Sequence, residues 1–311
     1  MTAPRHFLSI ADIPPAVLRA MVDRARALKA ARAGWPKGRP DADRPLDGRL
    51  VALIFEKAST RTRASFEAAA RQLGGSAMVF AAAEMQLGRG ESVADTARVL
   101  ARYVDAIMIR ARRHDQLLAL AKAASVPVLN GLTDLGHPCQ LMADVLTFEE
   151  RRGPIEGRTI AWLGDANNVA NSLIETAAAF GFRLRLGCPA AYRPSEERMA
   201  AAHAAGGEVL WTEDPAQAAA GADAVMTDTW VSMGQEGEAE KRLKELSPYR
   251  VSQRVMALAA PGALFLHCLP AHRGEEVDAE VIDGPASAVW DQAENRLHAQ
   301  KAILRWCLKV D

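Results

Sequence analysis

The sequence predicts an α/β protein of two doubly wound domains, each with a mostly parallel sheet flanked by helices. Its 311 residues fit two domains, at about 150 residues per domain. A turn that leads into an apolar run occurs twice, at residues 45–52 and 154–161. Apolar runs alternate with helical patterns through the second half. This alternation is typical of a parallel sheet covered by helices on both faces.

The composition excludes several other classes. Hydrophobic residues make up 49% and charged residues 24%, as in ordinary globular proteins. The 38 basic residues balance the 38 acidic ones, which argues against a dedicated nucleic-acid-binding or polybasic membrane-surface protein. No apolar run approaches the roughly 20 residues of a membrane helix, and the N-terminus lacks a secretory pattern. Four widely spaced cysteines without a CxxC pair fit a reducing cytoplasm.

The first domain is predicted to begin with an amphipathic helix, because apolar residues recur at helical spacing from Val17 onward. Asp12 precedes two prolines and is expected to cap this helix. Residues 34–45 are rich in proline, glycine and charge, and we expect a loop there. The apolar run 51–55 is a predicted buried strand, followed by a helix with Phe66 on its apolar face.

The charged stretch 149–154 predicts a boundary, so the domains are expected at residues 1–150 and 151–311, with the C-terminal helix packing back on the first. A helix is predicted over residues 195–205. Ligands of parallel sheets sit beyond the carboxyl ends of the strands, so functional residues are expected in the loops there. The strand candidates of the second half are residues 159–164, 183–186, 208–211, 224–227, 264–266 and 288–290.

The loop after the first strand predicts an anion site. Three hydroxyls and two guanidiniums stand together where a helix begins, and one capping side chain would need far fewer polar groups. The free N–H groups and the dipole of a helix start favour an anion, and arginine adds bidentate hydrogen bonds to phosphate. These residues are Ser59, Thr60, Arg61, Thr62 and Arg63.

A second loop, residues 134–140, carries His137 and Gln140. Arg110 ends the strand-like run 106–110. These three side chains could converge on one carbonyl oxygen, where donors that meet developing negative charge contribute strongly to acyl transfer.

Three more loops follow strands of the second half. Residues 164–172 occupy the position of a dinucleotide fingerprint but lack its glycines, which counts against a nicotinamide cofactor. Residues 227–236 contain Asp228. Cys268 follows a predicted strand and is flanked by His267 and His272. This position favours a functional cysteine over one that is merely buried in the core. These histidines do not suggest zinc, since Pro270 intervenes.

Four of these segments together resemble the aspartate/ornithine carbamoyltransferases. The Ser-Thr-Arg-Thr-Arg and His-Pro-Cys-Gln motifs match those shared across the family, and the resemblance covers nearly the whole chain in order. Asp-x-x-x-Ser-Met-Gly and His-Cys-Leu-Pro resemble the ornithine branch. The segments are residues 59–63, 137–140, 228–234 and 267–270.

The resemblance implies a role for each matching residue. Ser59, Thr60, Arg61 and Thr62 would hold the phosphate of carbamoyl phosphate. Its carbonyl would be bound by Arg110, His137 and Gln140, and carbamoyl phosphate would also be reached by Gln86, from a neighbouring subunit, and by Arg296. Ornithine would be bound by Asn168, Asp228, Ser232, Met233, Cys268 and Leu269.

Of these residues, the resemblance makes Cys268, Arg61, Arg110 and His137 catalytic. It implies direct attack of the ornithine side-chain amine on carbamoyl phosphate, without a covalent acyl-enzyme, because proximity supplies much of the barrier reduction. It also implies a homotrimer and closure of the second domain with the loop at Ser232. We expect no cofactor, no metal, no nucleic acid and no membrane partner, and a cytoplasmic location.

Alternative activities remain open at this point. A sister enzyme would carbamoylate putrescine or an acylated ornithine, although the Ser232-Met233 segment opposes this. A nicotinamide-dependent oxidoreductase would share the α/β pattern but needs the missing glycines. A catalytically silent paralogue would be expected to have lost some of these polar residues. The direction of the reaction in the cell, synthesis of arginine or breakdown of citrulline, is not encoded in these motifs.

Overall fold

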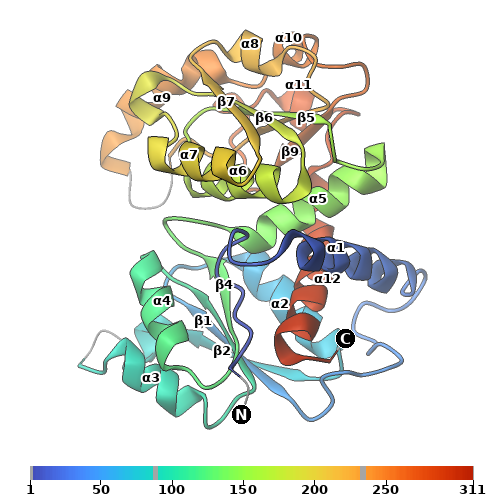
Figure 1. The fold of residues 1–311 in the computed structure, drawn as a ribbon, viewed down its shortest axis with the longest axis vertical. Coiled ribbons are helices and arrows are strands. Elements are labelled where there is room, and N and C mark those ends of the chain that lie inside the picture. The colour runs from blue at the N-terminus through green and yellow to red at the C-terminus, as the bar shows by residue number, and fades with distance from the viewer. Residues whose placement is uncertain (1–2, 87–89, 232–235, 311) are drawn as a thin grey trace. The chain divides into compact units, whose positions relative to one another are not determined.

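The computed structural model describes residues 3–86, 90–231 and 236–310. The chain forms two compact units (Figure 1). Unit 1 comprises Met1–Leu146 and Glu294–Asp311, and unit 2 comprises Thr147–Ala293. Two long helices carry the chain from one unit to the other, and they are α5 (Pro138–Arg152) and α12 (Val289–Leu308).

Unit 1 contains a four-stranded sheet in the order β2-β1-β3-β4, with every neighbouring pair parallel. Phe55 of β1 lies opposite Arg110 of β3, so the carboxyl ends of these two central strands meet at one edge. The strands are β1 (Leu50–Phe55), β2 (Ser76–Ala81), β3 (Ala106–Arg110) and β4 (Val128–Leu132).

Helices cover both faces of this sheet. Residues of α3 and α4 share one hydrophobic core with Ala52, Ile54 and Ile107 of the sheet, while α2 and α12 lie on the other side (Figure 1). The remaining helices of this unit are α1 (Pro15–Ala30), α2 (Thr60–Gln72), α3 (Val93–Leu100) and α4 (His114–Ala123).

Ion pairs, of which the ones to Asp41 are buried, join α12 to the rest of unit 1. The ammonium of Lys301 lies 2.6 Å from Asp41, and Arg305 lies 2.5 Å from Asp43. Asp41 also pairs with Arg32 at the end of α1, at 2.5 Å. A buried ionic group is tolerated only when paired, so the contact of Lys301 with Asp41 helps to specify where the last helix packs.

Unit 2 contains a five-stranded, fully parallel sheet in the order β7-β6-β5-β8-β9. All five residues of the central strand β5 are buried, as expected for a strand covered on both faces. The strands are β5 (Thr159–Leu163), β6 (Arg183–Gly187), β7 (Glu208–Thr212), β8 (Ala224–Thr227) and β9 (Leu264–His267).

Helices again lie on both sides of the sheet, with α8, α10 and α11 on one side and α6 and α7 on the other (Figure 1). Ala218, Val225, Phe265 and Val281 belong to the core on the first side. The helices are α6 (Asn168–Phe180), α7 (Glu196–Ala204), α8 (Pro215–Ala219), α9 (Ala239–Leu246), α10 (Gln253–Met256) and α11 (Ala279–Ile282). The predicted fold class of two doubly wound, parallel α/β domains is thus confirmed.

Two local predictions are wrong. Residues 288–290 form no strand: Ser287 makes a single bridge to Phe265, and the chain then enters α12 at Val289. A short apolar run fits either a strand or a buried helix start. Asp12 does not cap α1, because the residue before this helix is Pro14, which makes no side-chain cap. The fixed φ of proline already suits a helix start.

Two strands had no clear signal. The edge strand β2 is only partly buried, and β4 is interrupted by Asn130 and Gly131, residue types that are uncommon in strands. Here the Asn130 amide donates to the carbonyl of Leu8 at 2.9 Å. None of the helices in the described residues is long and apolar enough to cross a membrane.

Candidate active site

The start of α2 carries the first group of predicted site residues. Ser59 precedes the helix in an extended conformation, and its hydroxyl accepts a hydrogen bond from the N–H of Thr62. Thr60 and Arg61 form the first turn, where Thr60 is exposed and Arg61 is half-buried. The loop therefore presents a capped helix N-terminus at the carboxyl end of β1, which is a favourable place for an anion.

Thr62 joins three segments of unit 1. Its side chain is fully buried, and its Oγ1 lies 2.8 Å from a guanidinium nitrogen of Arg296 and 3.4 Å from one of Arg110. Arg110 ends β3, which pairs with β1, and Arg296 comes from α12. The structure thus brings together the hydroxyl and two of the predicted arginines.

His137 lies immediately before α5 and is 3% exposed. Burial lowers the pKa of His137 well below its usual range, and the positive charges of Arg296, Arg110 and Arg61 lower it further. Three guanidiniums therefore surround an imidazole that stays neutral at physiological pH. Such an imidazole can donate one hydrogen bond, but it cannot serve as a cationic acid.

Gln140 follows on the first turn of α5 and is fully buried. Its backbone N–H donates to the carbonyl of His137 at 3.0 Å, and its side-chain Nε2 donates to Asp144 at 2.8 Å. Burial raises the pKa of the neighbouring Cys139 thiol to about 12. That thiol donates to the carbonyl of Asn130, so Cys139 is a packing residue.

Gln86 stands apart from this group. It is exposed, and no hydrogen bond in the described part of the chain connects it to Thr62 or His137. Its predicted contact with carbamoyl phosphate stays a prediction.

The second group of site residues lies in unit 2, at the carboxyl ends of three neighbouring strands. Asp228 follows β8 and Cys268 follows β9, and the last residues of these strands, Thr227 and His267, lie opposite each other. Asn167 follows β5, the other neighbour of β8. The parallel register therefore explains why side chains far apart in sequence meet.

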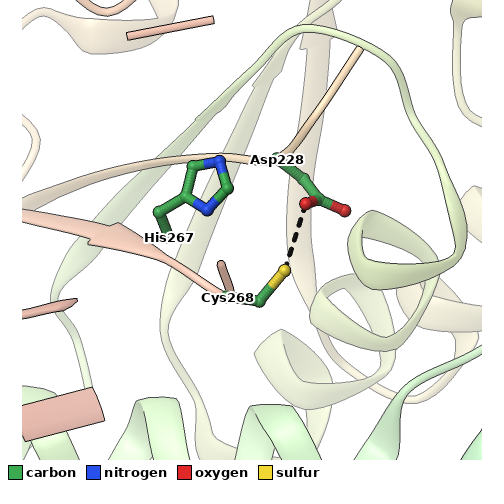
Figure 2. A group of neighbouring side chains, drawn as sticks. All are labelled: Asp228, His267 and Cys268. Atoms are coloured by element: carbon green, nitrogen blue, oxygen red, sulfur yellow. Dashed lines mark hydrogen bonds between the residues drawn. The ribbon is translucent and has the colours of Figure 1, made fainter. Parts of the chain in front are cut away.

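Asp228 is the centre of this group. Its carboxylate accepts hydrogen bonds from the Asn167 amide at 2.8 Å, from the backbone N–H of Thr229 at 2.8 Å and from the thiol of Cys268 at 3.1 Å. Figure 2 shows the Cys268 sulfur directed at this carboxylate. In this arrangement the sulfur carries its proton.

His267 lies beside this pair but is committed elsewhere. Its Nδ1 accepts the backbone N–H of Leu269 at 2.8 Å, and its Nε2 lies 3.2 Å from the carboxylate of Glu276. An Nδ1 that accepts leaves the proton on Nε2, so this residue is a neutral imidazole that donates to Glu276.

Two groups of side chains have the composition of a metal site, within the part of the chain that is described. Asp228, His267 and Cys268 lie within 4.8 Å of one another, but both ring nitrogens of His267 already have partners. The second group is His272, Glu275 and Glu276. There, Glu276 already accepts the N–H of His272 at 2.6 Å and binds His267. In both groups, potential ligand atoms are already engaged in hydrogen bonds within the protein, which does not favour metal binding.

Glu276 is fully buried, and Figure 2 leaves it outside the drawn group. Burial raises the pKa of this carboxyl, but the hydrogen bonds from His267 and from the N–H of His272 offset this, and the pKa is lowered overall. The ionised carboxylate of Glu276 thus orients the imidazole of His267, which in turn accepts the backbone N–H of Leu269. Sequence reasoning missed Glu276, because it stands among other charged residues, Arg273, Glu275 and Asp278, and nothing in the sequence marks it as the buried one.

Three further polar residues were also missed. Asn167 caps α6 and binds Asp228, whereas the predicted Asn168 is the half-buried first residue of that helix. Arg242 forms an ion pair with Asp165 and donates to the carbonyl of Trp230 at 2.6 Å. Burial raises the pKa of Asp165, and Arg242 opposes that rise. Arg242 is remote in sequence and had no motif to identify it.

The remaining predicted residues fall into two cases. Leu269 is half-buried and follows Cys268 directly, as its motif requires. Ser232 and Met233 lie outside the described residues.

Gly164 stands where a dinucleotide fingerprint would begin and has a φ of +122°. A Cβ there would lie 3.0 Å from Trp230, so this glycine is needed for packing rather than for a pyrophosphate.

Comparison with known protein families gives matches over both halves of the chain. Residues 5–150 match the family model described as "Aspartate/ornithine carbamoyltransferase, carbamoyl-P binding domain". Residues 156–307 match the model described as "Aspartate/ornithine carbamoyltransferase, Asp/Orn binding domain".

Individual relatives are similar over nearly their whole length. Ornithine carbamoyltransferase of Rhizorhabdus wittichii is 58% identical, with 98% of each chain covered, and that of Caulobacter vibrioides is 56% identical, with 99% of this chain and 98% of the relative covered. The solved ornithine carbamoyltransferase from Pyrococcus furiosus is 46% identical, with a TM-score of 0.91 over 97% of this chain and 96% of that one. The anabolic enzyme from Campylobacter jejuni is 36% identical, with a TM-score of 0.90 over 97% and 98%.

Proposed function

The chain belongs to the aspartate/ornithine carbamoyltransferase family, and from this premise we propose that it transfers the carbamoyl group of carbamoyl phosphate to the side-chain amine of L-ornithine, giving L-citrulline and phosphate. The observation that carries the proposal is the group of guanidiniums around Thr62 and His137 at the start of α2. Curated relatives at 56–58% identity are named for this reaction.

Carbamoyl phosphate is the substrate we assign to unit 1. Its phosphate would be held at the capped start of α2 by Ser59, Thr60, Arg61 and Thr62, because free N–H groups and guanidiniums favour a multiply charged anion. Its carbonyl oxygen would accept from the side chains of Arg110, His137 and Arg296. The motif implies that Gln140 also binds the carbonyl. We instead propose that it binds the NH2 group of carbamoyl phosphate, because its Nε2 donates to Asp144 and its buried Oε1 can only accept.

Ornithine is the substrate we assign to unit 2. The Asp228 carboxylate, with Asn167 and Cys268 bonded to it, is suited to an ammonium group. Asn168, Leu269, Ser232 and Met233 complete the assigned set. The family motifs, rather than contacts in the structure, support those four residues.

The reaction needs an ornithine side-chain amine without its extra proton. That amine forms a bond to the carbamoyl carbon, and the bond from this carbon to the phosphate oxygen breaks. Phosphate leaves with the electron pair, and the new amide nitrogen gives up one proton. Arg61, Arg110 and the neutral His137 would donate to the oxyanion and to the departing phosphate, which is the main catalytic contribution that fixed dipoles can make.

Three further proposals follow from family membership. We infer that the chain acts as a homotrimer, in which Gln86 reaches carbamoyl phosphate of a neighbouring subunit. We infer a cytoplasmic location and a role in arginine biosynthesis, the direction of the anabolic relative from Campylobacter jejuni. Neither a metal nor a cofactor has a part in the proposed steps.

A citrulline assay tests the proposal. Purified protein receives carbamoyl phosphate together with ornithine, putrescine, acetylornithine or aspartate in parallel. We expect turnover with ornithine alone. Turnover with another amine would overturn the assignment of Asp228 and Cys268 while keeping the phosphate site, and folded protein that is silent with every amine would be a non-catalytic paralogue.

A further inference from the structure

Asp144 lies one turn after Gln140 on α5, and no motif of the chain includes it. We propose that Asp144 is a positioning residue for carbamoyl transfer: its carboxylate holds the Gln140 amide so that the amide oxygen faces the NH2 group of carbamoyl phosphate. This inference rests on the proposed function of the same site.

The geometry of the pair supports this orientation. Gln140 Nε2 donates to Asp144 Oδ1 at 2.8 Å, and the two side chains are 0% and 4% exposed. The other end of the amide, Oε1, is buried and has no hydrogen-bond partner among the described residues. A buried carbonyl oxygen without a partner is costly, so this atom marks a place where a ligand donor is expected.

A carboxylate fixes the direction of a neighbouring amide. An ionised carboxylate only accepts hydrogen bonds, whereas an amide has a donating and an accepting end. If the Gln140 amide rotated by half a turn, its oxygen would face the Asp144 oxygen and a hydrogen bond would be replaced by repulsion. Asp144 thus selects one of two orientations that are nearly equal in shape.

The substrate needs the oxygen that this orientation presents. The NH2 group of carbamoyl phosphate has hydrogens to donate and requires acceptors. The guanidiniums of Arg61, Arg110 and Arg296 are donors only. They suit the phosphate and the carbonyl, but they would repel the NH2 hydrogens. An outward-facing Gln140 Oε1 supplies the missing acceptor and distinguishes carbamoyl phosphate from phosphates that lack an amide.

The test compares ligands that differ in this one group. Asp144→Leu removes the acceptor while keeping a side chain of similar size. We expect it to raise the KM for carbamoyl phosphate about tenfold, the usual effect of one lost hydrogen bond. The inhibition constants of acetyl phosphate, which has a methyl in place of NH2, and of inorganic phosphate should change less than about twofold. An equal loss for all three ligands, or no loss for any, overturns the proposal.

Two matched variants separate positioning from packing. Gln140→Leu should cause the same selective loss, and the double variant should lose little more than either single one, because both act through one interaction. Asp144→Asn keeps an accepting oxygen but permits both orientations, so it should restore most of the affinity. Additive losses in the double variant would contradict the proposal, and so would Asp144→Asn behaving like Asp144→Leu.

A binding measurement keeps this inference distinct from the proposed function. Urea unfolding of the intact protein at 25 °C, without any amine, reports how much each ligand stabilises the folded state. We expect carbamoyl phosphate to stabilise wild type more than acetyl phosphate does, and this difference to vanish in Asp144→Leu. If the citrulline assay fails but this difference is found, the positioning role stands and the proposed reaction falls. If wild type shows no difference between the two ligands, the inference itself is wrong.

Discussion

The hydroxyl of Thr62 accepts a hydrogen bond at 2.8 Å from the guanidinium of Arg296, a residue 234 positions later in the chain. Arg110 shares the same hydroxyl at 3.4 Å. A hydroxyl has two accepting lone pairs and one hydrogen. With both lone pairs facing guanidiniums, its hydrogen remains available as a donor. Thr62 therefore both orients two cations and keeps a donor of its own at the start of α2.

Removing that hydroxyl tests its importance. Thr62→Val keeps the shape of the side chain but faces two guanidiniums with a methyl group, so both lose an acceptor. We expect a loss of about 10- to 100-fold in kcat/KM for carbamoyl phosphate, and little change in the KM for ornithine, as measured by the citrulline assay. Ser65→Ala is the control, since the Ser65 hydroxyl donates to the backbone carbonyl of Thr62 and not to its side chain; it should stay close to wild type.

Arg61 and Arg63 form a matched pair on the first turns of α2. Arg61 is one of the cations whose charge lowers the pKa of His137, whereas Arg63 is exposed and paired with Glu67 at 2.6 Å. Arg61→Gly should reduce citrulline formation by at least about 1000-fold while the circular dichroism spectrum is unchanged. Arg63→Gly makes the same helix change and should retain near wild-type rates. Wild-type rates for Arg61→Gly would remove Arg61 from the proposed phosphate site.

His137 allows a prediction about pH. Because its pKa is held well below the usual range, the imidazole is neutral at pH 6.5 and above, and it acts as a fixed donor. His137→Gln should lower kcat by a factor that is the same at pH 6.5 and pH 9, as seen in parallel rate profiles of the two proteins. A ratio that changes tenfold per pH unit within this range would mean that the imidazole titrates during turnover.

Glu276 and Glu275 form a second matched pair. Glu276→Gln replaces the charged carboxylate partner of His267 with a neutral amide. The amide oxygen accepts more weakly than a carboxylate, so the imidazole is held less firmly against Leu269. We expect a several-fold increase in the KM for ornithine, no change in the KM for carbamoyl phosphate and a loss of about 1–3 kcal/mol of stability. Glu275→Gln alters a more exposed neighbour, and it should change neither the KM for ornithine nor the stability. Equal effects on both Michaelis constants would count against a local role.

His298 predicts an acid sensitivity of the fold. Burial, together with the charges of Lys301, Lys29, Arg32 and Lys37, lowers the pKa of His298 to about 3, with Glu294 at 3.9 Å. Between that value and about 6.5, the unfolded chain binds a proton that the folded chain does not. His298 therefore does not reduce the free energy of unfolding above pH 6.5. As the pH falls from 6.5 towards 3, its proton binding to the unfolded chain lowers that free energy progressively.

The variant His298→Gln should lack this decline. Comparing the free energies of unfolding at pH 7 and pH 5, we expect wild type to lose about 2 kcal/mol more than the variant. The difference between the two proteins at pH 7 reports packing alone and serves as the internal control. An identical loss in both proteins would show that His298 is not the titrating group.

The sequence predicted the fold class well because strands that are buried on both faces leave continuous apolar runs, as in β1, β5 and β9. It failed where this pattern was weak or ambiguous. Asn130 and Gly131 conceal β4, and their place in the sheet depends on contacts with Leu8 and Met108 that no local pattern records. The run 288–290 looked like a strand because three apolar residues carry no periodicity.

For the candidate site, local motifs identified the loops but not their buried partners. The residues around Ser59, His137 and Cys268 stand in compact motifs, so they were found. Asp144, Glu276 and Arg242 act through hydrogen bonds that only the folded chain creates. Asn167 rather than Asn168 contacts Asp228, because which of two neighbouring side chains points at a partner depends on the exact start of α6.

The division of unit 1 into two stretches of sequence reverses the usual order in which a new chain is completed. Domains generally fold as they emerge during synthesis, the N-terminal one first. Here unit 2 is contiguous, whereas unit 1 needs residues from Glu294 onward, including the Lys301 that pairs with Asp41. Synthesis begins with unit 1, yet unit 1 is the second of the two units to be complete. Its group of guanidiniums is complete only when Arg296 has been added. A truncated chain that ends at Ala293 would contain all of unit 2, but it would lack Arg296 and so one of the guanidiniums beside Thr62.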